Sequence, residues 1–465
     1  MDNDDQVLKS RDDKAPVKLS KVPDVTGKGV SFKVAGGGWC AWLKAEEQVG
    51  VDTLRPRIEP WLTALFQSEH LGLLVGSGLS HAVHQLATGN GLPGMAPVMF
   101  NHFQSEMQAE VRRSAAAAGR GDGNVEDQLR VANELLRGLE IIAGDDQHLQ
   151  EKNEGLRRDV NRVLENLAAS ILKGENGLIT ARPDDLDKAF NYLVSFLISF
   201  ASRTGTRDRL QIFTTNYDRF IEAGSEVAGL HLLDRFVGSL SPIFRSSRLD
   251  VDMHYNPPGI RGEPRYLEGV AKFTKLHGSL DWVDSQKTIR RIGLPFGATE
   301  IKPFLNAPGS RGVEALQLMV YPNSAKDRET TAYPYVELFR DFAAAVCRPN
   351  STLICFGYGF GDEHINRVIA DMLTIPSTHL VVISYSDPLG RIMKLYESMG
   401  RHAQITLMLG NHLGDFKTLV DNYLPKPAID RTTFRMAELL RARWTSGRPE
   451  PPSAAVTETK EGSEP

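Results

Sequence analysis

The chain has 465 residues, of which 41% are hydrophobic and 24% are charged, values typical of a soluble globular protein of roughly two to three domains. Its formal net charge of −4 gives no overall basic surface, which argues against direct nucleic-acid binding. The sequence has no run of about 18 apolar residues that could span a membrane, and its charged N-terminus lacks the apolar core of a secretion signal. We therefore expect a cytoplasmic protein.

The cysteines and histidines do not form a metal-binding pattern. Cys40, Cys347 and Cys355 are too few and too scattered for a disulfide framework or a four-thiolate zinc site. His81 and His84 have the spacing of two ligands on one helix, but no third ligand is apparent in the sequence. We expect no metal site.

The two ends of the chain differ in composition from the rest. Residues 1–48 mix Asp, Lys, Pro and Gly and predict a flexible N-terminal arm. Trp39 and Trp42 indicate that the end of this arm docks on its own chain or on a neighbour. Residues 426–465 predict one helix followed by a disordered tail rich in Pro, Ser and Glu.

Between these ends, apolar strands alternate with amphipathic helices, the pattern of an α/β fold with a Rossmann-like, doubly wound parallel sheet. Residues 49–99 and 206–425 are predicted to form this domain. Residues 100–205 are polar with apolar residues every three or four positions, which predicts a helical insertion. The expected strands are 71–75, 210–215, 272–276, 352–356, 380–385 and 404–409, with one more at 316–321 in an otherwise irregular region.

Four of the expected strands end in turns of unusual composition. Ligands of open α/β sheets bind beyond the carboxyl ends of the strands, so we expect these turns to share one edge of the sheet. The turns are Gly76-Ser77-Gly78-Leu79-Ser80, Thr214-Thr215-Asn216-Tyr217-Asp218, Leu276-His277-Gly278-Ser279 and Gly357-Tyr358-Gly359-Phe360-Gly361-Asp362.

The turn at 76–80 has two interpretations. It follows a buried strand and opens a helix, so its backbone and the helix dipole could bind a phosphate, but it could equally be a simple turn. The dinucleotide fingerprint is incomplete, because His81 stands at the third glycine position and no Asp or Glu lies about 20 residues further on. No Gly-Lys-Ser/Thr follows the turn, which excludes a P-loop.

Together the turns resemble the sirtuin family in its prokaryotic sirtuin-like branch. Gly-Ser-Gly-Leu-Ser at 76–80 is similar to the family's Gly-Ala-Gly-x-Ser phosphate turn. Thr-Asn-Tyr-Asp at 215–218 stands where deacylase members carry Gln-Asn-Ile-Asp, and Leu-His-Gly at 276–278 is similar to the catalytic-histidine motif. The resemblance covers roughly residues 70–425.

Departures from the family pattern indicate a subtype. Deacylase sirtuins carry a zinc module with two C-x-x-C pairs, which the three separate cysteines cannot make. The sirtuin-like proteins of bacterial antiviral defence lack that module, carry the Thr-Asn-Tyr-Asp form and destroy NAD to halt infected cells. The resemblance therefore implies an NAD glycohydrolase with NAD as its substrate and no metal.

The chemistry of this reaction suits the same residues. Cleaving the bond between nicotinamide and ribose builds oxocarbenium-like charge, and it needs a base with a pKa near neutrality and a group that orients water. His277 is suited to be the base, and Asn216 can orient a ribose hydroxyl and the attacking water. The residues expected to contact the dinucleotide are Gly76, Ser77, Gly78, Ser80, Thr215, Asp218, Gly357, Tyr358 and Asp362.

Structural alternatives stand beside these roles. Asn216 or Asp218 could cap the helix that follows, Asp362 could be a helix start, and His277 could be a structural histidine before a glycine turn. For the protein as a whole, the alternatives are a zinc-free NAD-dependent protein deacylase and a non-catalytic module that binds NAD or ADP-ribose.

An activity that destroys NAD must be off in healthy cells, so we expect control by assembly. The helical insertion and the two ends of the chain are the surfaces available for a homo-oligomer or a partner. The resemblance implies a ring-forming, translocase-like ATPase or an Argonaute-like protein as that partner. We expect contact with neither a membrane nor nucleic acid.

Overall fold

The computed structural model describes residues 5–23, 30–35, 40–44, 47–117, 121–203, 207–248, 251–255, 265–266, 269–285, 288–306, 317–318 and 333–426. The chain separates into two units, residues 1–425 and 426–465, and the first of them contains the central sheet and its helices. Trp39, the expected C-terminal helix and most of the expected strand at 316–321 lie outside the described residues.

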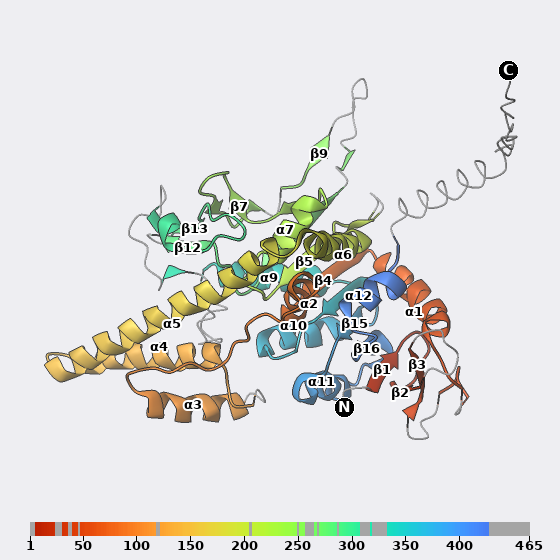
Figure 1. Ribbon diagram of the computed structural model, residues 1–465, viewed down its shortest axis with the longest axis horizontal. Helices are drawn as coiled ribbons and strands as arrows, with labels where there is room; N and C mark the ends of the chain where they lie inside the picture. The colour runs from red at the N-terminus through yellow and green to blue at the C-terminus, as the bar shows by residue number, and fades with distance from the viewer. Residues whose placement is uncertain are drawn as a thin grey trace, which may run out of the picture. The chain divides into compact units, whose positions relative to one another are not determined.

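A ten-stranded, mostly parallel sheet forms the centre of this unit (Figure 1), as the alternation of strands and helices predicts. Seven strands from β16 to β6 run parallel, and three at one edge are antiparallel. The order across the sheet is β3 (Ser31–Val34), β2 (Val17–Val22), β1 (Asp5–Lys9), β16 (Ile405–Leu409), β15 (His379–Ser384), β14 (Ser351–Phe356), β4 (His70–Val75), β5 (Gln211–Thr214), β11 (Val270–Lys275) and β6 (His231–Leu233).

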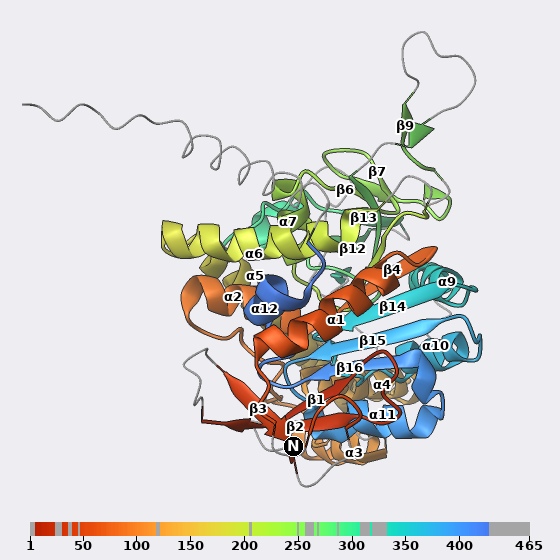
Figure 2. The same ribbon diagram turned by 90° about the vertical axis from the view of Figure 1, so that its right-hand side faces the viewer.

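Helices cover both faces of the sheet (Figure 2), because alternate residues of each buried strand point to opposite sides. Leu73 and Val75 of β4 pack into the core under one helical layer, and Leu74 between them packs into the core under the other. The first layer holds α1 (Val51–Phe66), α2 (Ser77–Thr88), α6 (Pro183–Ala201), α7 (Phe220–Val227), α12 (Phe416–Thr418) and η7 (Leu419–Tyr423). The second holds α9 (Tyr335–Val346), α10 (Glu363–Leu373) and α11 (Arg391–Met399).

The N-terminal segment differs from the flexible arm expected for residues 1–48. Its described residues form β1, β2 and β3, and β1 pairs with β16 of the central sheet. Lys9 is buried, and its Nζ donates a hydrogen bond to the carbonyl oxygen of Ile405 at 2.9 Å. Trp42 docks on its own chain, where Nε1 donates to Asp13 Oδ1 at 3.0 Å and Arg57 lies over the ring.

The helical insertion predicted for residues 100–205 contains α3 (Gln104–Ala117), α4 (Val125–Ile142) and α5 (Gln147–Ile179), which lie beside one another in Figure 1. Their core includes Val283 of a small second sheet, whereas α6 packs into the core of the central sheet. The other buried apolar side chains of the small sheet pack with α9, α10 and α11. The small sheet has the order β12 (Trp282–Ser285), β13 (Thr288–Arg291), β8 (Ile243–Phe244) and β7 (Phe236–Val237). The remaining short elements are β9 (His254–Tyr255), β10 (Arg265–Tyr266), η3 (Lys302–Asn306), η5 (Pro388–Gly390) and η6 (His402–Gln404).

Among the described residues, no helix is both long and apolar enough to cross a membrane.

The stability of the sheet is expected to fall on mild acidification because of His379 in β15. Burial, helped by the nearby charge of Lys9, lowers the pKa of His379 from 6.5 to about 4. Its Nε2 meets the hydroxyl of Thr406 at 2.8 Å, and that hydroxyl also accepts from Trp61 Nε1. The folded pKa lies below the unfolded one, so the unfolded state takes the proton first. Stability present above pH 6.5 is therefore lost as the pH falls towards 4, by at most about 3 kcal/mol.

Urea denaturation at pH 7 and at pH 5 measures this loss. A His379→Gln variant keeps an acceptor towards Thr406 but cannot titrate, so its midpoint should change less with pH than that of the wild type. Equal pH dependence in the two proteins would contradict the assignment to His379.

Candidate active site

The four turns singled out in the sequence follow four neighbouring strands. In the order β14, β4, β5 and β11 these strands are parallel, and Phe356, Val75, Thr214 and Lys275 are partners across them. The residues after these positions therefore emerge at the same carboxyl edge. The expectation that all four turns share one edge of the sheet is confirmed.

The direction of chain growth changes between β4 and β14. From β4 the chain builds the sheet towards β5, β11 and β6, and it then returns to the other side of β4 as β14. Such a switch point opens a crevice outside the strand ends, where doubly wound folds bind their ligands. The turns at 76–80 and 357–362 flank this point.

The glycines of these two turns allow the turns to touch. A Cβ atom on Gly76 would lie 2.4 Å from the carbonyl oxygen of Gly357, and one on Gly78 would lie 2.6 Å from the Cα of Gly357. Gly357 itself has a φ of +60°, a conformation that favours glycine. The amide of Gly76 donates to Phe356 and that of Gly78 donates to Gly357, each at 3.0 Å. These glycines thus have a packing role, and their contact with the dinucleotide stays a prediction, as does that of the exposed Ser77 at the start of α2.

The side chain of Asn216 is buried and held in one orientation. Its Nδ2 donates to the carbonyl oxygen of Gly76 at 3.0 Å and to Ser80 Oγ at 2.9 Å, while its backbone amide donates to Thr214 Oγ1 at 3.1 Å. Both hydrogens of Nδ2 are used within the protein, so the group that Asn216 can offer to a ligand is its acceptor oxygen Oδ1. Asn216 does not cap α7; this alternative is contradicted by its contacts.

Asp218 contacts the start of α7, as the alternative role of a helix cap predicts. Its Oδ1 accepts from the amide of Phe220, the first residue of α7, at 3.2 Å. Loss of solvent around the carboxylate raises the pKa of Asp218, an effect partly offset by the charge of Lys275 and a hydrogen bond from Ser80. The hydroxyl of Ser80 therefore lies between Asn216 and Asp218, and its predicted contact with the dinucleotide remains a prediction.

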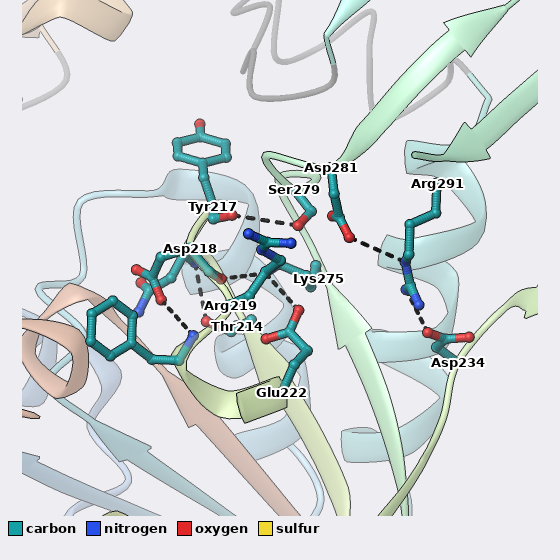
Figure 3. Close-up of polar contacts among 12 residues, drawn as sticks. Thr214, Tyr217, Asp218, Arg219, Glu222, Asp234, Lys275, Ser279, Asp281 and Arg291 are labelled. Atoms are coloured by element: carbon teal, nitrogen blue, oxygen red, sulfur yellow. Dashed lines mark hydrogen bonds and ion pairs between the residues drawn. The ribbon is translucent and has the colours of Figure 1, made fainter. Parts of the chain in front are cut away.

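A buried lysine beneath this turn joins it to the neighbouring strand (Figure 3). Lys275 of β11 is 1% exposed, and its Nζ donates to the backbone carbonyl of Asp218 and, at 2.9 Å, to Glu222 Oε1. Burial raises the pKa of Glu222, and the lysine charge opposes this effect. Two residues before His277, Lys275 thus ties the turn after β5 to the turn after β11.

Arg219, which follows Asp218 in the turn after β5, forms a buried ion pair with Glu175 of α5. The two side chains are 8% and 0% exposed, and the closest nitrogen and oxygen atoms are 2.5 Å apart. The backbone amide of Arg219 also donates to Glu175 Oε1 at 2.9 Å, and its guanidinium donates to the carbonyl oxygens of Leu294 and Pro295. A helix of the insertion is therefore anchored directly to the turn that carries Asn216.

His277 pairs with Asp362 across the edge of the sheet. The distance from His277 Nε2 to Asp362 Oδ2 is 2.8 Å, and both side chains are largely buried. Asp362 Oδ1 meanwhile caps α10 by accepting from the amides of His364 and Ile365. An ionised carboxylate only accepts hydrogen bonds, so it holds the ring hydrogen at Nε2 and leaves the lone pair of the neutral imidazole at Nδ1.

The turn that carries His277 is also held from its far side. Asp281, four positions later, lies 3.5 Å from the Nε of Arg291 in β13. Arg291 donates to Asp234 at 2.6 Å, and its guanidinium lies 4.4 Å from the ring centroid of Phe236. These carboxylates raise the pKa of Arg291 despite its burial (Figure 3). The small sheet thus supports the His277 turn through charged contacts.

Two further residues predicted to contact the dinucleotide have defined surroundings. The amide of Thr215 donates to the carbonyl oxygen of Val75 at 3.3 Å, which continues the pairing of β4 and β5. The side chain of Tyr358 is buried against Phe360, and its hydroxyl donates to the carbonyl oxygen of Asp362 at 3.4 Å. Their roles towards a dinucleotide stay predictions.

Sequence reasoning missed Lys275, Glu175 and the partnership of Asp362 with His277. Lys275 had a visible signal, since it is a charged residue in an apolar strand directly before Leu-His-Gly. Glu175 likewise falls on the apolar stripe of α5, between Leu172 and Leu178. The Asp362 contact had no local signal, because the strands before the two residues are not adjacent.

A comparison with known protein families matches part of the chain. Residues 210–403 match the model of the SIR2-like domain, a range that includes Asn216, His277 and Asp362 and begins after the turn at 76–80. No curated protein matches the chain. Within the described ranges, no group of three or more His, Cys, Asp or Glu side chains could hold a metal ion. The match supports a sirtuin-like family for this chain and an NAD-related function.

Proposed function

We propose that this protein is an NAD glycohydrolase, which cleaves NAD to nicotinamide and ADP-ribose and acts in bacterial antiphage defence by depleting NAD. The observation that carries the proposal is the pairing of His277 with Asp362 at the same sheet edge as the fixed amide of Asn216. One group is a base with a defined lone pair, and the other is an oriented acceptor. Hydrolysis at a ribose carbon needs both.

In the proposed reaction, the bond between the nicotinamide nitrogen and the ribose C1′ breaks, and its electron pair leaves with the neutral nicotinamide ring. A water oxygen then bonds to C1′, and Nδ1 of His277 takes a proton from that water. Asp362 stabilises the resulting imidazolium through its contact with Nε2. Asn216 Oδ1 accepts from a ribose hydroxyl or from the water and so aligns them.

The biological part of the proposal includes control by assembly. The insertion helices α3, α4 and α5, called the helical layer from here on, offer a surface for a second copy or for a partner such as a ring-forming ATPase or an Argonaute-like protein. Contacts made by Glu175 connect this layer to the turn of Asn216, which supports the layer as a route of control.

A single assay separates the proposal from its rivals. The pure protein is incubated with NAD, with and without an acetyl-lysine peptide, and nicotinamide is followed over time. We expect release without peptide, and a fall of about 100-fold or more in Asn216→Ala and His277→Ala. His70→Ala is a matched control, because His70 pairs with Asp208 at 2.8 Å but lies at the amino end of β4.

Other outcomes favour other functions. Release only with peptide would favour a zinc-free deacylase. Binding of NAD or ADP-ribose with no release, including in extracts of phage-infected cells, would favour a non-catalytic module. Release that survives both substitutions would contradict the site assignment.

A further inference from the structure

Tyr217 is the residue between Asn216 and Asp218, and its contacts join its own turn to two other parts of the molecule. Its backbone belongs to the turn after β5. Its side chain is 4% exposed and lies in the core shared by α3, α4 and α5. The backbone of Tyr217 therefore belongs to the candidate active site, while its side chain packs in the core of α3, α4 and α5.

The first contact is with the helical layer. The hydroxyl of Tyr217 donates to Glu126 Oε1 at 2.9 Å. Glu126 is in the first turn of α4, which is fixed by a reciprocal cap between Asn124 and Asp127. Burial and the neighbouring Glu126 carboxylate raise the pKa of Tyr217, so its hydroxyl remains a donor at neutral pH.

The second contact is with the turn that carries His277. The backbone carbonyl of Tyr217 accepts from the amide of Leu280 at 3.0 Å and from Ser279 Oγ at 3.4 Å, a contact drawn in Figure 3. The rings of Tyr217 and His277 have centroids 6.5 Å apart. Tyr217 is covalently part of the turn that carries Asn216, and its carbonyl oxygen is hydrogen-bonded to the turn that carries His277. One residue thus links the two turns.

We propose that Tyr217 is a positioning residue that transmits the position of α4, through its hydrogen bond to Glu126, to the two turns that carry Asn216 and His277. Neither Tyr217 nor Glu126 is required to touch the reacting atoms. The kinetic consequence of the link rests on the proposed NAD hydrolysis, whereas its structural consequence does not.

Hydrogen–deuterium exchange of the full chain tests the structural link. Tyr217→Phe and Glu126→Ala each remove the bond, and we expect roughly tenfold faster exchange in peptides covering 211–220 and 276–282. Glu126→Gln keeps an acceptor oxygen and should exchange as the wild type does. Tyr423→Phe is the matched control, because it removes a buried hydroxyl that bonds His412 at 2.8 Å outside these turns.

Nicotinamide release tests the kinetic consequence in the same proteins. We expect kcat to fall about tenfold in Tyr217→Phe and Glu126→Ala, with KM for NAD unchanged and with Glu126→Gln restoring the rate. The double variant should be no slower than either single one, because both remove the same bond. A wild type that releases no nicotinamide would refute the proposed function, while the exchange measurement would still decide the link.

Unchanged exchange in both turns, or a Glu126→Gln variant that behaves as Glu126→Ala, would overturn the proposal. So would an equal loss of kcat in Tyr423→Phe, since that would show a general effect of losing a buried hydroxyl.

Discussion

An Asp362→Asn variant is expected to lose on the order of 1000-fold in nicotinamide release while keeping its fold. The backbone amides of His364 and Ile365 need an acceptor, so the new side chain keeps its oxygen towards α10. Its NH₂ group then faces His277 Nε2 in place of Oδ2. Asn caps helices about as well as Asp, so we expect little change in stability.

The loss follows from the tautomer of His277. An amide N–H donates to Nε2, so the neutral ring must carry its hydrogen at Nδ1, the atom that should accept a proton. Steady-state rates and thermal unfolding of the variant measure the two effects separately. Asp146→Asn is the control, since Asp146 Oδ1 caps α5 through the amides of His148 and Leu149 in the same manner. A rate within about threefold of wild type in Asp362→Asn would rule out Nδ1 as the proton acceptor.

Glu175→Ala is expected to have the largest effect on stability, a loss of about 3–5 kcal/mol in the free energy of unfolding. Burial raises the pKa of Glu175, and the hydrogen bonds and charge of Arg219 oppose this effect. Removing the carboxylate leaves the guanidinium of Arg219 buried without its counter-ion. It also removes the acceptor of the Arg219 backbone amide at the start of α7.

Denaturation curves of Glu175→Ala, Arg219→Met and the double variant measure this effect. We expect the double variant to lose far less than the sum of the single losses, because no uncompensated charge remains. Glu110→Ala removes an exposed pair with Arg113 and should cost less than about 1 kcal/mol. Additive losses at positions 175 and 219 would contradict the interpretation.

Most of the parallel part of the fold could be predicted from the sequence, because its central strands are apolar on both faces, whereas the short edge strand β6 was not expected. In β14 and β15 every residue from 351 to 356 and from 380 to 384 is buried, and the turns after such runs are easy to place. The N-terminal strands escaped prediction because polar residues are buried in them. Gln6 is fully buried with its amide bonded to residues 411–413, and Lys9 reaches a carbonyl of β16.

The residues proposed for the candidate site could be singled out from the sequence, but the contacts between them could not. Asn216 and His277 stand out because each follows a strand in a recognisable turn. The contacts that orient them come from Gly76, Ser80 and Asp362, and these depend on the order of strands in the sheet. Hydrophobic periodicity identifies strands but carries no information about which strands are neighbours.

The pairing of β4 with β14 also sets when this site can exist during synthesis of the protein. The ribosome releases β4 early, but the glycine turn after it meets its counterpart only when residues 351–357 have emerged. The contact of Lys9 with Ile405 closes later still, across 396 positions of chain. Contacts this far apart in sequence form late and slowly. Asn216 and His277 are therefore synthesised many residues before β14, whose pairing with β4 completes this edge of the sheet.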